Sequence, residues 1–366
     1  MSQHPEQPYP HQSPAFTPPV QHRYTTSVRA PGTEELPLYM SARASRSSGG
    51  PEVVSFGGGH GLYAALRAFR LLTENLTAVV TVADDGGSSG RLRQELGGLP
   101  PGDLRMALAA LCDDGEWGRV WRDVIQSRFK SDGPLHDHSV GNLLISALWQ
   151  LLGDHVEGLD WMARLLRAHG RVLPMSSLPL RIEGDVEFAP GTAPEVVHGQ
   201  SALAATGGHL REVRLVPHNP PARAETIEAV QAAEILNLGP GSWYTSVMPH
   251  LLVPDLAEAI FTSNALRTLT LNLPGARAET RNLSLCDHLE SLHSHAPRLR
   301  FDYVLVDEDA AASEPELEAK AQRLFGSQLW TRPLRGRKES QHDSLKLAAC
   351  YRDVLLDAGI NVDEQW

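Results

Sequence analysis

The sequence predicts an α/β fold in which a mostly parallel β-sheet is covered by helices on both faces. Apolar runs of strand length alternate with segments whose apolar residues recur at helical spacing. The first two such runs are separated by one helical segment, as in a strand–helix–strand unit. The composition, with 42% hydrophobic and 21% charged residues, is that of a folded globular chain.

The first unit covers two strands and one helix. Residues 52–56 ("EVVSF") predict a strand, and the glycines that follow break it. Residues 62–72 predict a helix with an apolar stripe, and residues 76–83 ("LTAVVTVA") predict the second strand. The two strands are therefore expected to be parallel and joined by a right-handed crossover.

The same alternation continues toward the C-terminus. Helices are expected at 140–152 and 160–170. Strands at 171–175 and 211–217 enclose a stretch of irregular or antiparallel β structure, which predicts a small β insertion. The remaining predicted elements are a helix at 225–233, strands at 234–238, 266–273 and 302–307, and closing helices at 314–325 and 343–359.

Residues 1–50 differ from the rest of the chain. Prolines recur there among Gln, His, Ser and Thr, and the segment closes on "SARASRSSGG". Such a composition cannot bury enough apolar surface to offset the entropy of ordering it. We predict a disordered, proline-rich tail, with an arm that folds onto a partner as the alternative. Residues 51–366 are predicted to form a single α/β domain.

Charge, cysteine content and hydropathy argue against several classes of protein. The formal charge of −11 disfavours a general nucleic-acid binder, whose surface would be basic. The three cysteines are far apart and form no CxxC pair, so we expect a reducing, cytoplasmic location. No apolar stretch reaches the roughly 18–20 residues of a membrane span. The N-terminus lacks the apolar core of a signal peptide.

Ligand chemistry is expected beyond the C-terminal ends of the parallel strands. Four loops there are rich in small or polar residues, at 57–61, 84–90, 239–246 and 272–280. If the strands are parallel, all four loops gather at one edge of the sheet. This convergence is a stronger signal than any single loop.

The first loop, "FGGGHG", contributes Gly57, Gly58, Gly59 and Gly61. Glycines let the backbone approach a ligand closely, and the free N–H groups of the following helix can bind an anion. The pattern meets the GxGxxG fingerprint only in part and lacks the Lys of a P-loop. Tight packing of the helix on the strand is therefore the alternative.

The second loop, "ADDGGSSG", offers the carboxylates of Asp84 and Asp85, followed by Ser88 and Ser89. In a dinucleotide fold, an acid at this place holds a ribose hydroxyl. Two acids together predict a Mg²⁺ site, since Mg²⁺ prefers oxygen ligands and phosphate-bearing partners. An Asx-turn that closes the strand is the alternative.

Two further segments supply candidate residues. Asp103 is expected to cap the helix that begins near Leu104, and its nearness to the acidic loop also makes it a site candidate. His138 and Asn142 lie at the start of an apolar helix, where a histidine could bond a phosphate or a substrate hydroxyl. Zinc is not expected, because no third ligand follows at a recognised spacing.

The third loop, "GPGSWYTS", combines Gly239 and Gly241 with the hydroxyls of Ser242, Tyr244 and Thr245. Backbone N–H groups and hydroxyls together suit a phosphate or a sugar. The alternative is that the two aromatic residues of the loop anchor it in the core.

These segments together resemble the YvcK-type gluconeogenesis factors of the CofD-like family, which includes 2-phospho-L-lactate transferase. The candidate residues above fall on the family motifs, which occur in family order between about Val53 and Leu347. The matching segments are "GGGHGLYAALRAFR", "LTAVVTVADDGGSSGRLR", "PPGDLRMALAAL", "HDHSVGNLLISAL" and "LGPGSWYTSVMPHL".

The resemblance implies a Rossmann-like core and a cytoplasmic bacterial protein needed for normal cell shape during growth on gluconeogenic carbon sources. It implies binding of a UDP-sugar, UDP-N-acetylglucosamine, with NAD and Mg²⁺ as further candidate ligands. The implied role is a regulator that links carbon supply to cell-wall precursor synthesis through a protein partner. A homo-oligomer is also expected.

The chain departs from the family pattern at three places. His60 stands where the family has Thr, "PGARAET" is longer than the family's "PGET", and Gln341 stands where a basic residue is common. Whether the protein is an enzyme stays open, and a CofD-like, Mg²⁺-dependent transferase of a phospho-lactate-type group is the alternative function. An NAD-dependent dehydrogenase is disfavoured, because the glycine motif is incomplete and no hydride-transfer site is evident.

Overall fold

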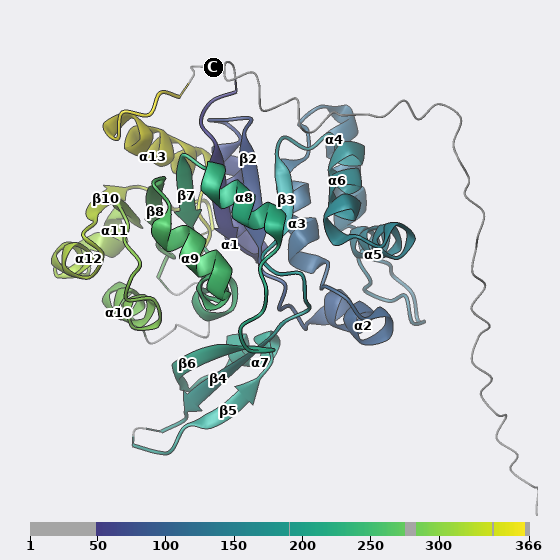
Figure 1. Cartoon of the computed structure of the whole chain (residues 1–366), viewed down its shortest axis with the longest axis horizontal. Coiled ribbons are helices and arrows are strands. Elements are labelled where there is room, and N and C mark those ends of the chain that lie inside the picture. The colour runs from purple at the N-terminus through teal and green to yellow at the C-terminus, as the bar shows by residue number, and fades with distance from the viewer. Residues whose placement is uncertain (1–48, 190, 275–282, 339, 363–366) are drawn as a thin grey trace, which may run out of the picture. The chain divides into compact units, whose positions relative to one another are not determined.

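The computed structural model describes residues 49–362, apart from 190, 275–282 and 339. The predicted proline-rich tail lies almost wholly outside this part of the chain. Within it, the structure has a seven-stranded parallel sheet with helices on both faces and a separate three-stranded antiparallel sheet (Figure 1). The predicted fold class is therefore confirmed.

The parallel sheet has the strand order β10-β9-β8-β7-β1-β2-β3. Every neighbouring pair is parallel. The chain goes from β1 outward to β2 and β3, then returns on the other side of β1 as β7, so the topological switch point lies between β1 and β7. The strands are β1 (Val53–Gly57), β2 (Leu76–Val80), β3 (Arg171–Pro174), β7 (Ile235–Leu238), β8 (Leu266–Thr270), β9 (Tyr303–Asp307) and β10 (Gln328–Arg332).

Helices cover both faces of this sheet. On one face α1 (Gly59–Phe69) packs against α3 (Gly102–Leu111) and α13 (Ser344–Asp357). On the other face α8 (Ala224–Ala232) packs against α9 (Pro254–Thr262), in front of the sheet in Figure 1. All residues of β1, β7 and β9 are buried, as expected for strands covered on both sides.

The other helices lie around this core. They are α2 (Gly87–Leu96), α4 (Glu116–Gln126), α5 (Val140–Leu152), α6 (His155–Leu166), α10 (Leu285–His295), α11 (Glu308–Ala312) and α12 (Leu317–Phe325). A π-helical turn (Trp243–Val247) and a 3₁₀ turn (Met248–Leu252) connect β7 to α9. No helix in the described part of the chain is long and apolar enough to cross a membrane.

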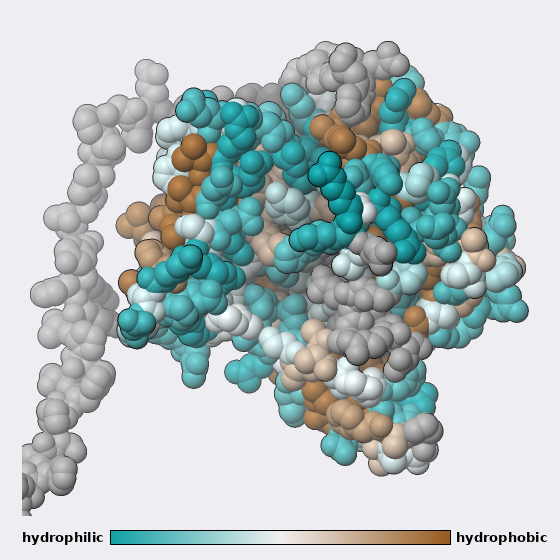
Figure 2. Space-filling view, turned by 180° about the vertical axis from the view of Figure 1, so that it is seen from behind, coloured by the Kyte–Doolittle hydropathy of each residue, from teal (hydrophilic) through white to brown (hydrophobic). Residues whose placement is uncertain are grey.

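The β insertion forms its own antiparallel sheet, in the order β5-β4-β6. Its elements are β4 (Arg181–Glu187), β5 (Glu195–His198), α7 (Gln200–Ala205) and β6 (His209–Val216). Leu203 of α7 is buried against this sheet. Apolar residues gather at the lower end of the molecule in Figure 2, where the insertion lies, and the exposed side chains there include Phe188 and Val196.

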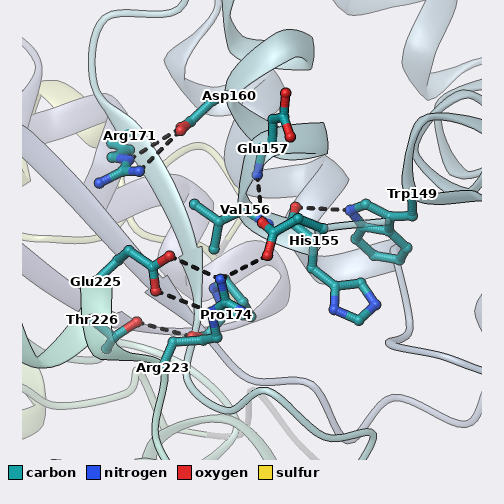
Figure 3. Close-up of polar contacts among 11 residues, drawn as sticks. Trp149, His155, Val156, Glu157, Asp160, Arg171, Pro174, Arg223, Glu225 and Thr226 are labelled. Carbon is teal, nitrogen blue, oxygen red and sulfur yellow. Dashed lines mark hydrogen bonds and ion pairs between the residues drawn. The ribbon is translucent and has the colours of Figure 1, made fainter. Parts of the chain in front are cut away.

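An arginine clamp holds the chain where it leaves the insertion and re-enters the sheet (Figure 3). Arg223 donates hydrogen bonds to Asp154 Oδ2 at 3.0 Å and to Glu225 Oε1 at 2.8 Å. Thr226 Oγ1 donates to Pro174 O, at the end of β3, at 2.9 Å. These bonds join the start of α8 to the start of α6 and to the end of β3.

Several element boundaries differ from the prediction. The predicted helix at 140–152 is confirmed as α5, but α6 begins at His155 and ends at Leu166, earlier than the predicted 160–170. The strand predicted at 76–83 ends at Val80. The acidic loop was expected to run to Gly90, whereas α2 begins at Gly87. Its "GSSG" start has low helix propensity, and tertiary packing overrides that preference.

Candidate functional site

The predicted convergence of four loops is confirmed by the strand order. The loops after β2, β1, β7 and β8 follow four adjacent parallel strands, so their starts share one edge of the sheet. Most of the fourth loop lies outside the described residues, including the positions of "PGARAET" from Gly275 onward. Asn272 represents that loop in the site.

The first and third loops are pressed together at the switch point. A Cβ atom on Gly61 would lie 2.5 Å from Cα of Gly241 and closer still to the carbonyl oxygen of Pro240. Atoms approach no nearer than about 3 Å without a bond, so only glycine fits at position 61. The start of α1 and the loop after β7 therefore form two walls of one cleft.

The third loop is fixed by its own hydrogen bonds. The Gly239–Pro240 peptide bond is cis. The side-chain amide of Asn272 pairs with the backbone of Gly241. Its oxygen accepts a hydrogen bond from Gly241 N at 2.9 Å, and its nitrogen donates one to Gly241 O. The hydroxyls of Ser242 and Thr245 bond to one another. All of these groups organise the backbone at the C-terminal end of β7.

The hydroxyls of the third loop are buried. Ser242, Tyr244 and Thr245 are each no more than 2% exposed. Tyr244 Oη accepts a hydrogen bond from Ser291 Oγ at 3.2 Å, so this ring anchors the loop to α10. Trp243 is likewise buried and stacks on His288 with ring centroids 5.4 Å apart. The core-anchor alternative thus describes both aromatic residues, and ligand contacts by the hydroxyls stay a prediction.

Asp84 lies in the interior of the site. Its Oδ1 accepts a hydrogen bond from Gly86 N at 2.9 Å, and Oδ2 lies beside Gly102 and Ser89 at the start of α3 and α2. Burial raises the pKa of this carboxyl, although the hydrogen bonds from Gly86 and Ser89 oppose the shift. Burial makes the ionised form of such a carboxyl unfavourable. A cationic or hydrogen-bond-donating ligand would stabilise that ionised form.

Asp85 points elsewhere. Its Oδ1 accepts hydrogen bonds from Ser201 N at 3.0 Å and Ser201 Oγ at 2.8 Å, at the start of α7. Asp85 thereby ties the acidic loop to the β insertion. The two carboxylates have different partners, and a Mg²⁺ ion shared by Asp84 and Asp85 stays a prediction. Among the residues that the structure describes, no group of three or more His, Cys, Asp or Glu side chains could hold a metal ion.

Asp103 is not the helix cap that we expected. The helix α3 begins at Gly102, two residues before the expected start near Leu104, with Pro101 at the N-cap position. No side-chain hydrogen bond caps the start of this helix. The Asp103 carboxylate instead lies against Gly58, where a Cβ would also meet Thr81 Cγ2 at 2.7 Å. Asp103 therefore belongs to the site through its contact with the first glycine loop.

Ser88, which follows the acidic loop, contacts both His138 and Asn142. Its Oγ accepts hydrogen bonds from Asn142 Nδ2 at 3.1 Å and Ser139 N at 3.3 Å. The hydroxyl proton is then left for His138 Nδ1, 3.0 Å away. A neutral His138 ring that accepts this proton at Nδ1 carries its own proton on Nε2. Burial, aided by the nearby Arg91, lowers the pKa of His138 in agreement with this state.

The cleft at the switch point has a volume of about 470 Å³. Sequence reasoning had not singled out Tyr63 or the role of Asn272, because nothing in the local pattern distinguishes a cleft-facing Tyr or Asn from a structural one. His60 and Gln341, both noted as departures from the family, are part of its wall. The cleft is lined by His60, Gly61, Tyr63, Ala64, Pro240, Gly241, Asn272, Leu273, Ser340, Gln341, His342 and Ser344.

His342 is the most strongly perturbed titratable group of the cleft. Its Nε2 atom is buried and makes no hydrogen bond within the described residues. Burial lowers its pKa to about 4, so the ring is neutral at physiological pH. The His342 residue lines the cleft, but this nitrogen is shielded, so a ligand would reach it only after the cleft wall shifts.

A larger recess, of about 670 Å³, lies at the opposite edge of the sheet. Its lining includes Glu234 and Leu266, which lie at the beginnings of β7 and β8. No glycine loop from a strand's C-terminal end reaches it. The cleft at the switch point is therefore the better candidate, because it has close backbone approach and a helix N-terminus together.

Comparison with known families shows which family the chain belongs to. The family model described as 2-phospho-L-lactate transferase CofD matches residues 53–349. The chain belongs to the CofD family. The matched range of this CofD-family chain contains every candidate site residue, from the first glycine loop to His342.

Relatives of the CofD-family chain are named as gluconeogenesis factors. A "Putative gluconeogenesis factor" of Mycobacterium leprae is 46% identical over 308 residues, 83% of this chain and 86% of the relative. The "Gluconeogenesis factor" of Bacillus subtilis is 36% identical over 264 residues, 72% of this chain and 81% of the relative. A crystal structure of a UPF0052-family member from Bacillus halodurans matches with a TM-score of 0.74 and 34% identity, covering 83% of this chain and 100% of that one.

Proposed function

We propose that this gluconeogenesis-factor relative is a regulator that binds a UDP-sugar, UDP-N-acetylglucosamine, in the cleft at the switch point. Its role would be to link carbon supply to cell-wall precursor synthesis, and so to cell shape, through a protein partner in the cytoplasm. The observation that carries the proposal is the contact between Gly61 and the Pro240–Gly241 loop. It brings the N-terminus of α1 and a second glycine loop to one cleft.

The chemistry of the cleft suits a nucleotide diphosphate sugar. Glycine backbones and the first turn of α1 favour the negative charge of a diphosphate. Asn272 and His342 add amide and imidazole groups of the kind that bond sugar and base edges. The volume of about 470 Å³ lies within the range of about 300–1,000 Å³ for small-molecule sites. NAD shares the diphosphate and remains a second ligand to test.

Isothermal titration calorimetry with UDP-N-acetylglucosamine, with and without Mg²⁺, tests the proposal directly. We expect saturable binding, and we expect His342→Ala to weaken it, because the variant removes one of the side chains that line the cleft. The control is His218→Ala, which changes an exposed histidine outside the cleft lining, and urea unfolding of both variants separates lost binding from lost stability. An absence of heat from the folded protein at any Mg²⁺ concentration would contradict the proposal.

A CofD-like transferase is the second candidate, because the matching family model is named for 2-phospho-L-lactate transferase. In that function, Mg²⁺ at the acidic loop would stabilise charge on a transferring phosphoryl group. Asp84 is the better placed of the two carboxylates, since Asp85 is bonded to Ser201. Asp84→Asn should then abolish turnover of a phospho-lactate donor while leaving the thermal unfolding curve nearly unchanged. If the unaltered protein makes no product, the transferase candidate loses its support.

A further inference from the structure

The part of α1 that faces the cleft carries an aromatic ring. Tyr63 lies three residues after His60 and directly before Ala64, and all three residues line the cleft at the switch point. Because residues three and four apart share one face of a helix, this face of α1 is the one turned toward the cleft. Among the lining residues that the structure describes, Tyr63 alone supplies a phenol ring.

The Tyr63 side chain is supported by the protein but not covered by it. It packs against the apolar core, yet it is only half-buried. Within the described part of the chain, its ring forms no stacking or cation–π contact, and its hydroxyl makes no hydrogen bond. The cleft beside it has a volume of about 470 Å³, which is enough for a planar ring system. The ring therefore offers a free face to a ligand.

Gln341 lines the same cleft from the segment before α13, and it is exposed. Its backbone is fixed, because Gln341 N donates a hydrogen bond to Lys338 O at 2.9 Å and Gln341 O accepts one from Gly336 N at 2.8 Å. Its side-chain amide has no hydrogen-bond partner among the described residues, whereas the amide of Asn272 already makes two bonds to Gly241. The Gln341 amide can therefore present a donor and an acceptor side by side to a ligand.

The rest of the cleft lining carries no ionic side chain. Among its described residues there is no Asp, Glu, Lys or Arg, and burial lowers the pKa of His342 to about 4, so that ring is neutral. A ring face and a free amide in such a lining favour an uncharged, planar part of a ligand over a charged one. Of the parts of a nucleotide, this description fits the base.

We propose that Tyr63 and Gln341 form a nucleobase subsite in the cleft, in which the base stacks on the Tyr63 ring and its polar edge bonds to the Gln341 amide. Uracil presents an N–H donor between two carbonyl acceptors, and an amide can pair with such an edge through both of its groups. The phosphates are then left to the glycine backbone at the start of α1. This inference rests on the proposed function, since it takes the ligand to be a nucleotide.

Calorimetry of the full chain with uridine diphosphate and with its 5,6-dihydrouracil analogue tests the stacking. The analogue keeps the diphosphate and the polar edge of the base, but its ring is puckered and not aromatic. The unaltered protein should bind uridine diphosphate roughly 5- to 100-fold more tightly than the analogue, as expected for a base stacked on an aromatic side chain. Tyr63→Leu should bind the two ligands alike, whereas Tyr63→Phe should keep the preference.

Uridine diphosphate methylated at N3 of the base tests the contact with Gln341, because the methyl group removes the N–H donor of the polar edge. The unaltered protein should prefer the unmethylated ligand by roughly three- to tenfold, the range of one hydrogen bond. Gln341→Ala should lose this preference. Gln126→Ala, which changes an exposed glutamine on α4 outside the lining, is the matched control and should keep it.

A preference for the aromatic base that persists in Tyr63→Leu would overturn the proposal, and so would equal binding of the two ligands by the unaltered protein. Each variant is compared with itself across two ligands, so a general loss of stability does not imitate the expected result. The second outcome needs no variant and decides the matter even where Tyr63→Leu does not fold.

Failure of this subsite and failure of the proposed function give different results. If UDP-N-acetylglucosamine binds the unaltered protein and Tyr63→Leu equally well, the proposed function stands and the base subsite falls. If UDP-N-acetylglucosamine does not bind, while NAD binds and is weakened by Tyr63→Leu, the proposed ligand is wrong and the base subsite stands. If neither nucleotide binds, both proposals fall.

Discussion

Gly61 on α1 and Pro240 in the loop after β7 touch so closely that no side chain fits between them. The contact joins the two halves of the sheet at the switch point, and both residues line the candidate cleft. Even the single methyl group of an alanine at position 61 would therefore clash with the loop after β7.

Gly61→Ala is expected to lower the free energy of unfolding by about 2–3 kcal/mol, because the methyl group would force backbone against backbone. The same variant should reduce binding of UDP-N-acetylglucosamine, since relief of the clash requires the cleft walls to separate. Urea unfolding and calorimetry measure the two effects. Gly133→Ala is the control, because a Cβ there would meet no atom within 4 Å. A variant at position 61 as stable as the one at 133 would show that the loops do not touch.

Asp85→Ala is expected to loosen the insertion rather than to unfold the protein. The variant removes the acceptor of Ser201 N and Oγ at the start of α7. Because these bonds are exposed, the loss in stability should be only about 1 kcal/mol. Amide hydrogen exchange in α7 should become faster, while exchange in the strands of the parallel sheet stays unchanged.

Ser201→Ala removes only one of the two hydrogen bonds between Asp85 and Ser201. It keeps the backbone donor and loses only the hydroxyl bond, so its effect on α7 exchange should be smaller. Unchanged exchange in Asp85→Ala, together with lost Mg²⁺ binding, would instead identify Asp85 as a metal ligand.

Ser88→Ala should cost about 2–3 kcal/mol of stability, although it removes a single oxygen atom. That oxygen accepts hydrogen bonds from Asn142 Nδ2 and Ser139 N, and both donors would be left buried and unpaired. Thermal or denaturant unfolding measures the change. Ser294→Ala, at an exposed serine on α10, should stay within about 0.5 kcal/mol of the unaltered protein. Similar values for the two variants would refute the buried network.

Acid should destabilise the protein through three histidines that are neutral when folded. Burial lowers the pKa values of His250, His288 and His342 to about 4. The unfolded chain takes up protons at its histidines below about pH 6.5, whereas the folded chain does so only near pH 4. Stability should therefore fall as the pH drops from about 6.5 to about 4, by roughly 1–3 kcal/mol for each histidine.

His288→Phe isolates one of these contributions. The phenyl ring retains an aromatic partner for Trp243 and cannot take up a proton. Urea midpoints measured between pH 7 and pH 4 should fall less steeply for this variant than for the unaltered protein. An identical slope would mean that His288 is not buried as a neutral ring.

The sequence was informative wherever one local rule decided the outcome. The apolar periodicity of 140–152 predicted α5 at its observed bounds, and buried strands such as β1 and β9 read as continuous apolar runs. The glycine loops could be placed at one sheet edge, because parallel strands bring their C-terminal ends together.

The sequence could not show where a side chain points when its partners lie far along the chain. Adjacent aspartates look equivalent in "ADDGG", yet Asp84 is half-buried by α3 while Asp85 bonds to Ser201, far along the chain. The start of α2 at "GSSG" contradicts local propensity. The place of Tyr63 in the cleft wall is also invisible in sequence, because "GLYAAL" is an ordinary helical pattern.

The position of the cleft at the switch between β1 and β7 has a consequence for synthesis on the ribosome. Its walls come from residues near 60, near 240 and near 342, so the cleft draws on both ends of the CofD-family domain. An incomplete chain can form the β1–β2–β3 half of the sheet but presents an open edge at β1 until β7 emerges. A ligand of the proposed cleft would therefore bind only chains in which this whole domain has been made.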